Sequence, residues 1–483
     1  MILNGKTIRY IYCLGIGGVG VSALAEILLK KGYRVSGSDV FPNNNTERLC
    51  RLGANITFNY SKKTIVESDC VVYSSAITSD NPGFIVAQRA KIPILKRGQM
   101  LAKLMTGYQS IAISGSHGKT TTSALLADVF TTANLDPTFV IGGVLNRVQT
   151  SVRLGYGPLF ITEADESDAS FLYMRPNIGV ITNIDSDHLS AYEGDFNRLK
   201  DAYVQFIHQI HKDGVVVLCI DDLVLHALIP TLSQRVITYG FSSKAEYRAD
   251  SFLQKGLQSN FRMYRLSKKN KTLSVRINLV GRHNVLNSLA VIAVSEWIGV
   301  DEKKLLQSLT QFSGVERRFD IKGEMMLANG KALVVEDYGH HPNEIRATLL
   351  AARAAWPGSR IVLVFQPHRY SRTQGLIYDF ASVLVETDVL VLLEIYSAGE
   401  IPIPGIDGDT LLKIVRNHTT KKTVFVPRLQ DLQKVLQKLV QPNDVVILQG
   451  AGNVGSAATA LTSVRCTVGK YVRRKNRKIC ASV

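Results

Sequence analysis

The stretch SIAISGSHGKTTT at residues 110–122 decides how the chain is read, because it joins an apolar strand pattern to a glycine loop and then to a helix pattern. In such a loop the backbone amides cradle phosphate groups, and the lysine after the second glycine reaches their outer oxygens. Lys119 has that position here, and the hydroxyl of Thr120 can ligate Mg²⁺. The loop is shorter than the usual form, since only Ser116 and His117 separate the two glycines. The predicted ATP-binding residues of this loop are Gly115, Ser116, His117, Gly118, Lys119, Thr120 and Thr121.

A second glycine loop, GIGGVG at residues 15–20, stands between the strand pattern 8–14 and the helix pattern 19–30. Glycines there let the backbone approach a diphosphate, and Asp39, at the end of the next strand pattern, is placed like a carboxylate that binds a ribose hydroxyl. Alone, the loop is compatible with NAD, with another diphosphate-linked nucleoside, or with a purely structural turn. Together with the loop at 110–122, it favours one ATP and one nucleotide-linked substrate. The residues predicted to bind that substrate are Gly15, Gly17, Gly18, Val19, Gly20, Asp39, Ser74, Ser75 and Arg97.

Strand and helix patterns alternate in three series along the chain, which predicts an α/β protein of three domains with separate sheets. These are an N-terminal Rossmann-like domain (1–107), a central P-loop ATPase-like domain with a parallel sheet (108–312) and a C-terminal domain with a Rossmann-like sheet (313–464). Antiparallel β structure is expected across 252–279, within the central domain. The last residues, 465–483, are predicted to form a flexible basic tail.

The composition excludes several classes of protein. The chain has 483 residues, of which 46% are hydrophobic, so it can fill several cores and is neither disordered nor fibrous. Its apolar runs, such as Val389–Leu393, are far shorter than the roughly 20 residues that cross a bilayer, and the N-terminus lacks the pattern of a signal peptide. The six cysteines form no CxxC pair and are expected to be reduced thiols. We therefore expect a cytoplasmic protein without membrane insertion.

The net charge of +17 is concentrated in two regions. Residues 1–110 carry 14 Lys or Arg against 6 Asp or Glu, and residues 465–483 carry 7 against none. Outside the tail the basic residues are not interleaved with aromatic ones, and no nucleic-acid-binding motif is recognisable. A positive N-terminal domain suits a polyanionic substrate such as a diphosphate-linked sugar. No specific nucleic-acid partner is therefore expected.

Acidic residues follow two neighbouring strand patterns of the central domain. Glu163 opens the segment EADESD after the strand pattern 159–162, and TNIDSDH (182–188) follows the pattern 178–181. Either segment alone reads as a solvated loop or a helix cap. Behind a phosphate loop, at the carboxyl ends of parallel strands, the two together favour a metal site. The predicted metal ligands are Thr120, Glu163 and His188.

Seven motifs, in this order, resemble those of the Mur ligase family of cell-wall amino-acid ligases. They are GSHGKTTT (115–122), EADESDASF (163–171), TNIDSDH (182–188), GRHNVLNSLAV (281–291), GVERRFD (314–320), EDYGHHPNE (336–344) and FQPHRYSRT (365–373). The match covers about residues 8–460 and is closest to the ligases that add the first amino acid. It implies ATP-dependent ligation of L-alanine to the lactyl carboxylate of UDP-N-acetylmuramic acid through an acyl phosphate, the first amino-acid addition in cytoplasmic peptidoglycan precursor synthesis.

The resemblance also implies roles for single residues. The implied catalytic residues are Lys119, Glu163, His188, Arg318 and Asp337. Beside the loop, the implied ATP contacts are Asn284, Asn287, Arg318 and Asp337, and the implied amino-acid contacts are Tyr338, His340, His368 and Arg372. An arginine at the carboxyl edge of a strand can bind an α-carboxylate bidentately, which supports Arg372 independently. Two Mg²⁺ ions are expected, with Mn²⁺ as a possible substitute, and the sequence gives no oligomeric state.

Two other functions are compatible with parts of the sequence. One is a ligase of the same family that attaches a whole peptide to the same nucleotide sugar, and the stretch HRYSR at 368–372 argues against it. The other is a nucleic-acid-binding protein that uses the positive charge. Offering ATP and the UDP-sugar with either L-alanine or a tripeptide distinguishes the two ligases. Salt-sensitive DNA binding by a chain without the tail would favour the nucleic-acid-binding function.

Overall fold

The computed structural model describes residues 1–462 apart from positions 4, 75, 188 and 267–271. The predictions for Ser75, His188 and the tail 465–483 therefore lie outside the described residues. The described chain divides into two compact units. Unit 1 comprises Met1–Asp250, Arg262–Leu273 and Leu286–Thr310, and unit 2 comprises Ser251–Phe261, Ser274–Val285 and the chain from Gln311 onward. The domain boundaries predicted at 107, 312 and 464 stay predictions.

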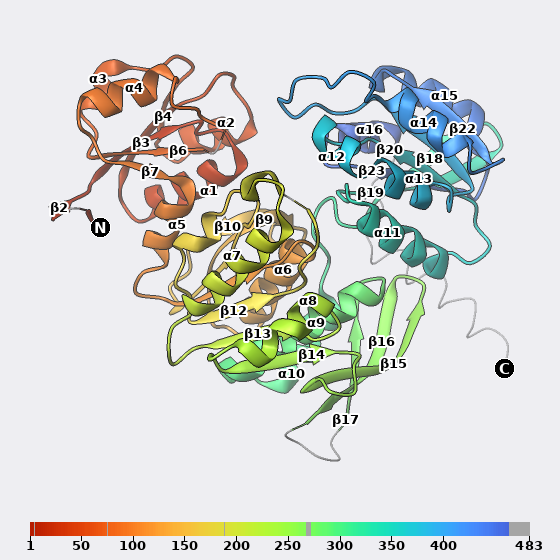
Figure 1. The fold of residues 1–483 in the computed structure, drawn as a ribbon, viewed down its shortest axis with the longest axis horizontal. Helices are drawn as coiled ribbons and strands as arrows, with labels where there is room; N and C mark the ends of the chain where they lie inside the picture. Colours follow the sequence, from red (N-terminus) through yellow and green to blue (C-terminus); the bar gives the residue numbers. More distant parts are fainter. Residues whose placement is uncertain (4, 75, 188, 267–271, 463–483) are drawn as a thin grey trace. The chain divides into compact units, whose positions relative to one another are not determined.

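The N-terminal part of unit 1, red and orange in Figure 1, holds a five-stranded parallel sheet. Its strands, in spatial order, are β5 (Asn55–Thr57), β4 (Arg34–Ser38), β3 (Tyr10–Leu14), β6 (Cys70–Tyr73) and β7 (Ile94–Lys96). The helices are α1 (Val19–Lys30), α2 (Asn44–Arg51), α3 (Lys62–Val66), α4 (Pro82–Arg89) and α5 (Arg97–Met105), and a small hairpin pairs β1 (Ile2–Leu3) with β2 (Lys6–Thr7). Every residue of β3 is buried, as expected for the central strand of a parallel sheet.

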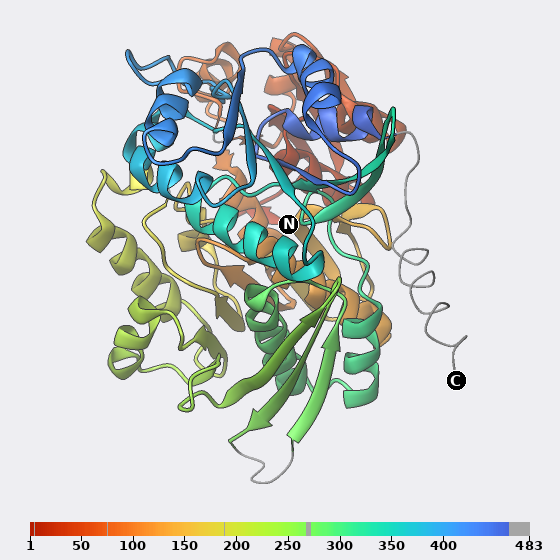
Figure 2. The same ribbon diagram turned by 90° about the vertical axis from the view of Figure 1, so that its right-hand side faces the viewer.

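A ten-stranded sheet follows in the chain. In spatial order its strands are β10 (Thr150–Arg153), β9 (Thr138–Leu145), β11 (Leu159–Glu163), β8 (Gln109–Ser114), β12 (Ile178–Ile181), β13 (Val215–Cys219), β14 (Val236–Gly240), β15 (Tyr247–Lys255), β16 (Gln258–Arg265) and β17 (Thr272–Ile277). From β9 to β15 neighbouring strands are parallel, and β10 is antiparallel to β9. The last three strands are the long green arrows low in Figure 2.

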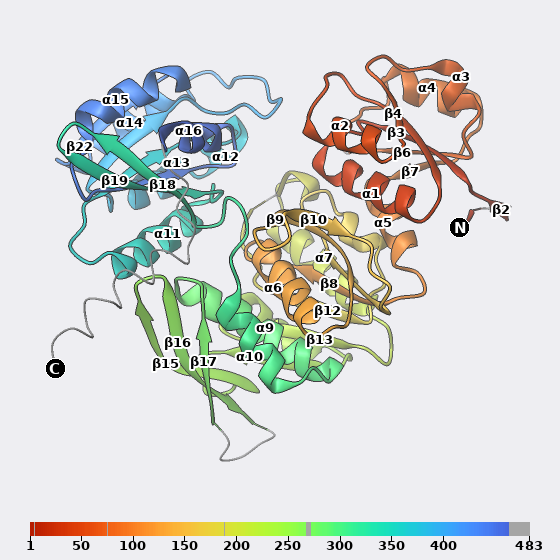
Figure 3. The same cartoon turned by 180° about the vertical axis from the view of Figure 1, so that it is seen from behind.

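The helices along this second sheet begin with α6 (Lys119–Thr132), which packs on β8, β9 and β11 and crosses the sheet in Figure 3. The others are α7 (Phe196–His208), α8 (Leu223–Leu228), α9 (Arg282–Ile298) and α10 (Glu302–Gln311), with short 3₁₀ helices η1 (Ser170–Tyr173), η2 (Leu189–Tyr192) and η3 (Ile229–Thr231). Strand β8 lies between β11 and β12, so the loop that follows it and the two acidic segments that follow β11 and β12 share one sheet edge.

Unit 2 contains a third sheet of six strands. Their spatial order is β18 (Asp320–Leu327), β19 (Gly330–Asp337), β23 (Val445–Gln449), β20 (Ile361–Phe365), β21 (Val389–Leu393) and β22 (Lys422–Val426). All neighbours are parallel except the antiparallel edge strand β18. The helices are α11 (Pro342–Ala355), α12 (Tyr370–Gly375), α13 (Ile377–Leu384), α14 (Gly408–Arg416), η4 (Leu429–Asp431), α15 (Leu432–Leu439) and α16 (Val454–Leu461).

Both faces of this third sheet are buried, because alternate side chains of each strand enter two separate apolar cores. Leu363 of β20 packs in the core that contains α11, α13 and α14, whereas Val362 and Val364 pack in the core that contains α15 and α16. The prediction of separate α/β sheets is confirmed. No helix in the described chain has the length and apolar character needed to cross a bilayer.

Candidate active site

The phosphate loop connects β8 to α6 and depends on its two glycines. Gly115 has a φ of 125° and Gly118 a φ of 87°, in the left-handed region that glycine tolerates best. A Cβ added at Gly115 would lie 2.1 Å from the hydroxyl oxygen of Thr182, and one added at Gly118 would lie 2.6 Å from the side-chain oxygen of Asn287. Asn287, which the family resemblance predicts to contact ATP, is therefore packed against the loop. Thr121, a predicted ATP-binding residue, lies in the first turn of α6.

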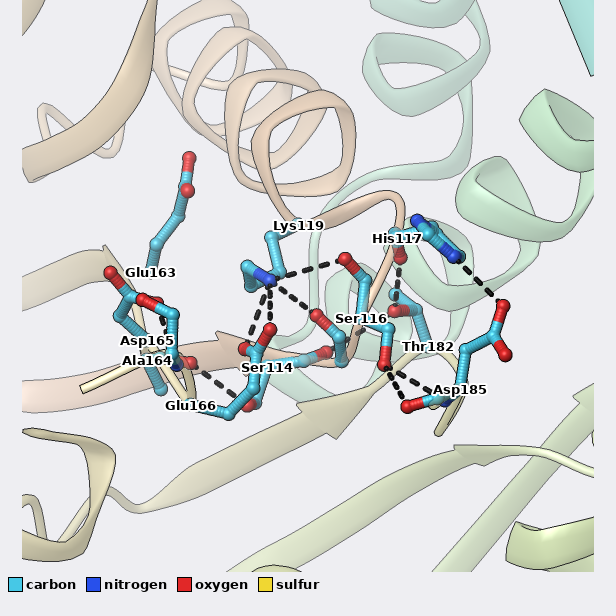
Figure 4. Close-up of polar contacts among 12 residues, drawn as sticks. Ser114, Ser116, His117, Lys119, Glu163, Ala164, Asp165, Glu166, Thr182 and Asp185 are labelled. Carbon is cyan, nitrogen blue, oxygen red and sulfur yellow. Dashed lines mark hydrogen bonds and ion pairs between the residues drawn. The ribbon is translucent and has the colours of Figure 1, made fainter. Parts of the chain in front are cut away.

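Lys119 is held in the loop by a buried carboxylate (Figure 4). Its Nζ donates to both oxygens of Glu166, at 2.8 and 2.9 Å, and to the carbonyl of Gly115 at 2.5 Å. The Glu166 side chain is 1% exposed. Burial raises the pKa of Glu166 to about 7, against the opposing charge of Lys119. Burial lowers the pKa of Lys119, but the neighbouring carboxylates, Glu166 first, raise it overall, so the ammonium stays charged.

The predicted metal ligands Thr120 and Glu163 lie together. Glu163 ends β11, and its carboxylate accepts hydrogen bonds from the Thr120 hydroxyl (3.2 Å), the Ser123 hydroxyl (3.1 Å) and the amide of Gly142 (2.6 Å). A Cβ added at Gly142 would lie 2.8 Å from a Glu163 oxygen, so the carboxylate sits in a close backbone cradle. Carboxylate and hydroxyl oxygens are the donors that Mg²⁺ prefers, and this donor set fits that ion.

The segment after β12 braces the phosphate loop from the other side (Figure 4). The Nε2 atom of His117 lies 3.1 Å from a carboxylate oxygen of Asp185, and the His117 amide donates to the side chain of Asn183 at 2.9 Å. The amide of Asp185 donates to the Ser116 hydroxyl at 2.8 Å. The motif TNIDSDH therefore fixes the conformation of the loop through residues other than His188.

The N-terminal glycine loop is held by Asp39. Its carboxylate accepts hydrogen bonds from the amide of Gly17 and from the amide of Val40, both at 2.7 Å. The side-chain amide of Asn45 donates to the carbonyl of Gly17 at 3.0 Å. Asp39 thus anchors the loop itself, a role that the sequence did not reveal, and its predicted contact with a ribose hydroxyl stays a prediction.

The other residues predicted for the nucleotide-linked substrate surround this loop. A Cβ added at Gly20 would lie 2.6 Å from Cδ of Arg97, and one added at Gly15 would lie 3.3 Å from Cβ of Ser74. Gly18 is the N-cap residue of α1, and Val19, the first helical residue, has an exposed side chain. The structure therefore brings the described members of the predicted set together at the carboxyl edge of the first sheet.

Arg97 also contacts the acidic segment of the second sheet. One of its guanidinium nitrogens lies 3.4 Å from Asp165 and 3.3 Å from Asp168. Burial alone would raise the pKa of Asp165, but the charges of Lys119 and Arg97 bring it below its ordinary value. The segment 163–168 therefore contacts two cations. One is Lys119 of the phosphate loop, and the other is Arg97, which lies beside the N-terminal glycine loop.

In unit 2, Asp337 ends β19 and is buried. Its carboxylate accepts hydrogen bonds from the amides of Phe319 (2.9 Å) and Gly339 (2.8 Å) and from the side chain of Gln449 (2.9 Å). Burial raises the pKa of Asp337. These bonds fix the chain beside Arg318, whose guanidinium lies 5.0 Å from the centre of the Tyr338 ring. The roles predicted for Asp337 and Arg318 toward ATP stay predictions.

Asn284, another residue predicted to contact ATP, lies in the first turn of α9. It is buried, and its side-chain amide donates to the carbonyl of Val280 at 2.8 Å. This bond caps the chain that enters the helix. The contact of Asn284 with ATP also stays a prediction.

The predicted amino-acid contacts form a cluster in unit 2. His368 Nδ1 lies 3.4 Å from a guanidinium nitrogen of Arg372, and the centres of the His340 and His368 rings are 6.0 Å apart. The ring of Tyr338 lies 5.6 Å from that of His340, and Tyr396 stacks on His368 at 5.5 Å. Burial, with the charge of Arg372, lowers the pKa of His368 to about 4, so this ring is neutral at pH 7.

A cavity of about 260 Å³ opens beside this cluster, lined in part by Gln366, Tyr396 and Asn453. The Gln366 side chain is fixed, since it donates to Asn453 at 2.8 Å and accepts from the amide of Val454 at 3.1 Å. Tyr396 was not predicted, because it lies 24 residues beyond Arg372 and nothing in its surrounding sequence marks it.

The chain matches models of three domains of one family. They are the Mur ligase family catalytic domain (10–109), the Mur ligase middle domain (113–295) and the Mur ligase glutamate ligase domain (317–452). The UDP-N-acetylmuramate–L-alanine ligase of Coxiella burnetii (strain Dugway 5J108-111) is 62% identical over 461 residues, covering 95% of this chain and 99% of its own. The chain belongs to the Mur ligase family. The homologue of Coxiella burnetii strain RSA 493 has the same identity and coverage.

Solved structures of Mur ligases share the fold. The UDP-N-acetylmuramate–alanine ligase MurC of Thermotoga maritima is 29% identical with a TM-score of 0.78, covering 97% of this chain and 99% of its own. The murein peptide ligase of Psychrobacter arcticus is similar in fold, with a TM-score of 0.68 over 95% of this chain and 100% of its own at 23% identity. The resemblance seen in the sequence motifs is therefore confirmed, and so is the mixed α/β fold of a Mur ligase.

Proposed function

We propose that this protein joins L-alanine to the lactyl carboxylate of UDP-N-acetylmuramic acid, with ATP converted to ADP and phosphate. The observation that carries this proposal is the arrangement of the phosphate loop, in which Lys119 and the Thr120–Glu163 pair lie at one sheet edge. The ligase of Coxiella burnetii, with its name and its 62% identity over nearly the whole chain, supports the choice of both substrates. The use of ATP and a UDP-sugar places the reaction in the cytoplasm.

The reaction needs ATP because a carboxylate is a poor electrophile. In the first step an oxygen of the lactyl carboxylate attacks the γ-phosphorus of ATP, the bond from that phosphorus to the β-bridging oxygen breaks, and ADP leaves. In the second step the amino group of alanine attacks the carbonyl carbon of the acyl phosphate. The C–O bond to phosphate breaks, the nitrogen loses a proton, and phosphate and the amide are released. Positioning and charge stabilisation supply most of the catalysis.

Lys119 and the loop amides stabilise the charge on the transferred phosphoryl group. The ammonium is protonated and already placed by Glu166, so it needs little reorganisation when ATP binds. Thr120 and Glu163 would hold Mg²⁺ here, with His188 as a further predicted ligand, and the ion would supply charge neutralisation at the phosphates. We also propose that the site binds two Mg²⁺ ions and that Mn²⁺ can replace them.

The cluster in unit 2 recognises the amino acid. Arg372 offers a guanidinium to the α-carboxylate, and it is oriented by its bonds to the ring and to the carbonyl of His368. Because His368 is neutral at pH 7, it does not repel the guanidinium and can accept a hydrogen bond. Tyr338 and His340 extend the same cluster.

The N-terminal glycine loop binds the diphosphate of the UDP-sugar. The first helical residues of α1 present aligned amide groups at the loop, no side chain caps the helix at Gly18, and Arg97 brings a positive charge to Gly20. The excess of Lys and Arg in residues 1–110 favours the approach of such a polyanion.

The route of the oxygen tests this mechanism. UDP-N-acetylmuramic acid labelled with ¹⁸O in the lactyl carboxylate is incubated with ATP, Mg²⁺, L-alanine and the enzyme. The expected result is one labelled oxygen in the released phosphate and one in the amide, measured by mass spectrometry. Unlabelled phosphate would exclude an acyl phosphate, and the absence of any amide would exclude the ligation.

A further inference from the structure

A second cavity, of about 550 Å³, lies in unit 1 away from the two glycine loops. It is lined by the C-terminal half of α5, by the start of β8 and by the segment between η1 and β12. Ser110, near the start of β8, lines it, whereas the phosphate loop follows the other end of that strand. Ser110 and Ser114 are four residues apart, or about 13 Å along the strand, so the cavity is separate from the ATP site.

The cavity walls carry positive charge without matching negative charge. Lys103, Arg175 and His211 line it, and no lining residue is Asp or Glu. Within the described ranges no ion pair or hydrogen bond engages the side chain of Lys103 or Arg175. A carboxylate oxygen of Asp213 lies 3.8 Å from a ring nitrogen of His211, and the Asp213 side chain is 94% exposed. A concave wall with two uncompensated cations attracts an anion.

Aromatic and aliphatic groups complete the cavity. Tyr108 is fixed, because its ring packs edge-on against Phe160 at 5.4 Å and its hydroxyl accepts a hydrogen bond from Lys31 at 2.8 Å. Tyr173 also lines the cavity, and its side chain is 39% exposed. Apolar groups of Leu95 and Met105 lie on the wall as well. Small-molecule sites commonly have this composition and a volume of roughly 300–1,000 Å³.

We propose that this cavity is a binding site for a small organic phosphate with a planar or apolar body. The phosphate would pair with Lys103 and Arg175, and the body would lie against Tyr173 and the apolar wall. None of these residues belongs to the ligation site, so the ligand binds in addition to the three proposed substrates. The proposal does not depend on the identity of the reaction.

The test uses 1-naphthyl phosphate as the probe, measured by isothermal titration calorimetry on the full chain. The titration uses the substrate-free chain, because AMP-PNP and the UDP-sugar are themselves phosphates with planar bases and would compete for the cavity, and the variants below locate the bound probe. The site predicts binding of one equivalent, with inorganic phosphate and 1-naphthol each at least tenfold weaker. Equal binding of phosphate alone or of naphthol alone would overturn the proposal, and so would the absence of binding.

A pair of variants locates the binding. K103A/R175A removes both cations from the cavity and is expected to weaken naphthyl phosphate binding at least tenfold. K434A/K438A removes the same charge from two exposed positions of α15 and is expected to leave binding unchanged. Both variants should release phosphate from ATP, with all three substrates, at the wild-type rate, which shows that they are folded. Equal binding by wild type and K103A/R175A would place the probe elsewhere and overturn the proposal.

Discussion

The two glycine loops of unit 1 follow one plan with different details. Each follows a buried parallel strand and opens a helix, β3 to α1 in the first and β8 to α6 in the second. The first loop takes both its carboxylate anchor, Asp39 after β4, and its cation, Arg97 at the start of α5, from other elements. The second has its cation within the loop, as Lys119, and takes its carboxylate anchor, Glu166, from another strand end.

We infer from this difference that the first loop only binds its ligand, whereas the second takes part in phosphoryl transfer. A diphosphate that is only bound needs amide groups at a helix N-terminus and a nearby charge, and we propose that the start of α1 and Arg97 provide them. A phosphoryl group that is transferred needs a cation fixed in place before the reaction, and a buried carboxylate fixes Lys119. Both cations contact the segment 163–168. We therefore expect changes at the second loop to lower the rate and changes at the first to weaken binding.

The largest effect is expected for K119A. Removing the ammonium that stabilises the transferred group should lower kcat by about 1,000-fold or more. Binding of the UDP-sugar, measured by calorimetry, should change little, because Lys119 belongs to the second loop. The exposed K212A is the control and should retain full activity. If K119A also lost the UDP-sugar, the assignment of one ligand to each loop would be wrong.

E163Q should have the next largest effect. Glutamine keeps the volume of the side chain but not the negative charge, so the rate should fall roughly 100-fold and more Mg²⁺ should be needed for half-maximal activity. A titration of phosphate release against Mg²⁺ measures both quantities. S123A removes another hydrogen bond to Glu163 and keeps its charge, and it should shift the Mg²⁺ requirement far less. An unchanged Mg²⁺ requirement in E163Q would contradict the metal assignment.

E166Q should affect both stability and rate. It leaves the ammonium of Lys119 without its buried partner, which should lower the free energy of unfolding by about 3 kcal/mol and kcat/KM for ATP by roughly tenfold. The phosphates of a bound nucleotide restore a counter-charge, so AMP-PNP with Mg²⁺ should raise the melting temperature more in E166Q than in the wild type. Equal increases in the two proteins would show that Glu166 does not hold the charge of Lys119.

R97A should have the smallest effect of the four. The glycine loop keeps its backbone and Asp39, so the KM for the UDP-sugar should rise about tenfold while kcat changes little. R89A removes an exposed charge from α4 in the same sheet region and should leave KM unchanged. A fall in kcat without a change in KM would reverse the distinction between the two loops.

Part of this site could be predicted from the sequence, because a glycine loop between a strand pattern and a helix pattern, and a carboxylate at the end of a strand pattern, are specific signals. Helix α1 has the predicted bounds 19–30, and Glu163 lies at the strand end beside Thr120, as the spacing indicated. Glu166 could not be predicted, since the segment EADESD contains four carboxylates and the sequence does not show which one is buried. The same holds for Asp39, whose contact with the amide of Gly17 depends on how the loop folds back.

Among the strands that the sequence left undetected, β18 and β10 are edge strands, whereas β9 and β14 lie inside the ten-stranded sheet. In β18 (Asp320–Leu327) the polar, partly buried residues Asp320, Lys322 and Glu324 alternate with less polar positions, and the strand pairs on one side only. Such a strand lacks the continuous apolar run by which the central strands are recognised. Strand β10 (Thr150–Arg153) is an edge strand of the same kind. Pairing with the neighbouring strand, rather than the intrinsic β-propensity of their residues, determines that both segments form strands.

The most direct test of the central claim is a phosphate-release assay with purified protein, ATP and Mg²⁺, across single amino acids and a tripeptide, with and without UDP-N-acetylmuramic acid. The account predicts fast release only when the UDP-sugar and L-alanine are both present, in equal amounts with the amide product. Release that requires the tripeptide, or that proceeds at the same rate without the UDP-sugar, would contradict it.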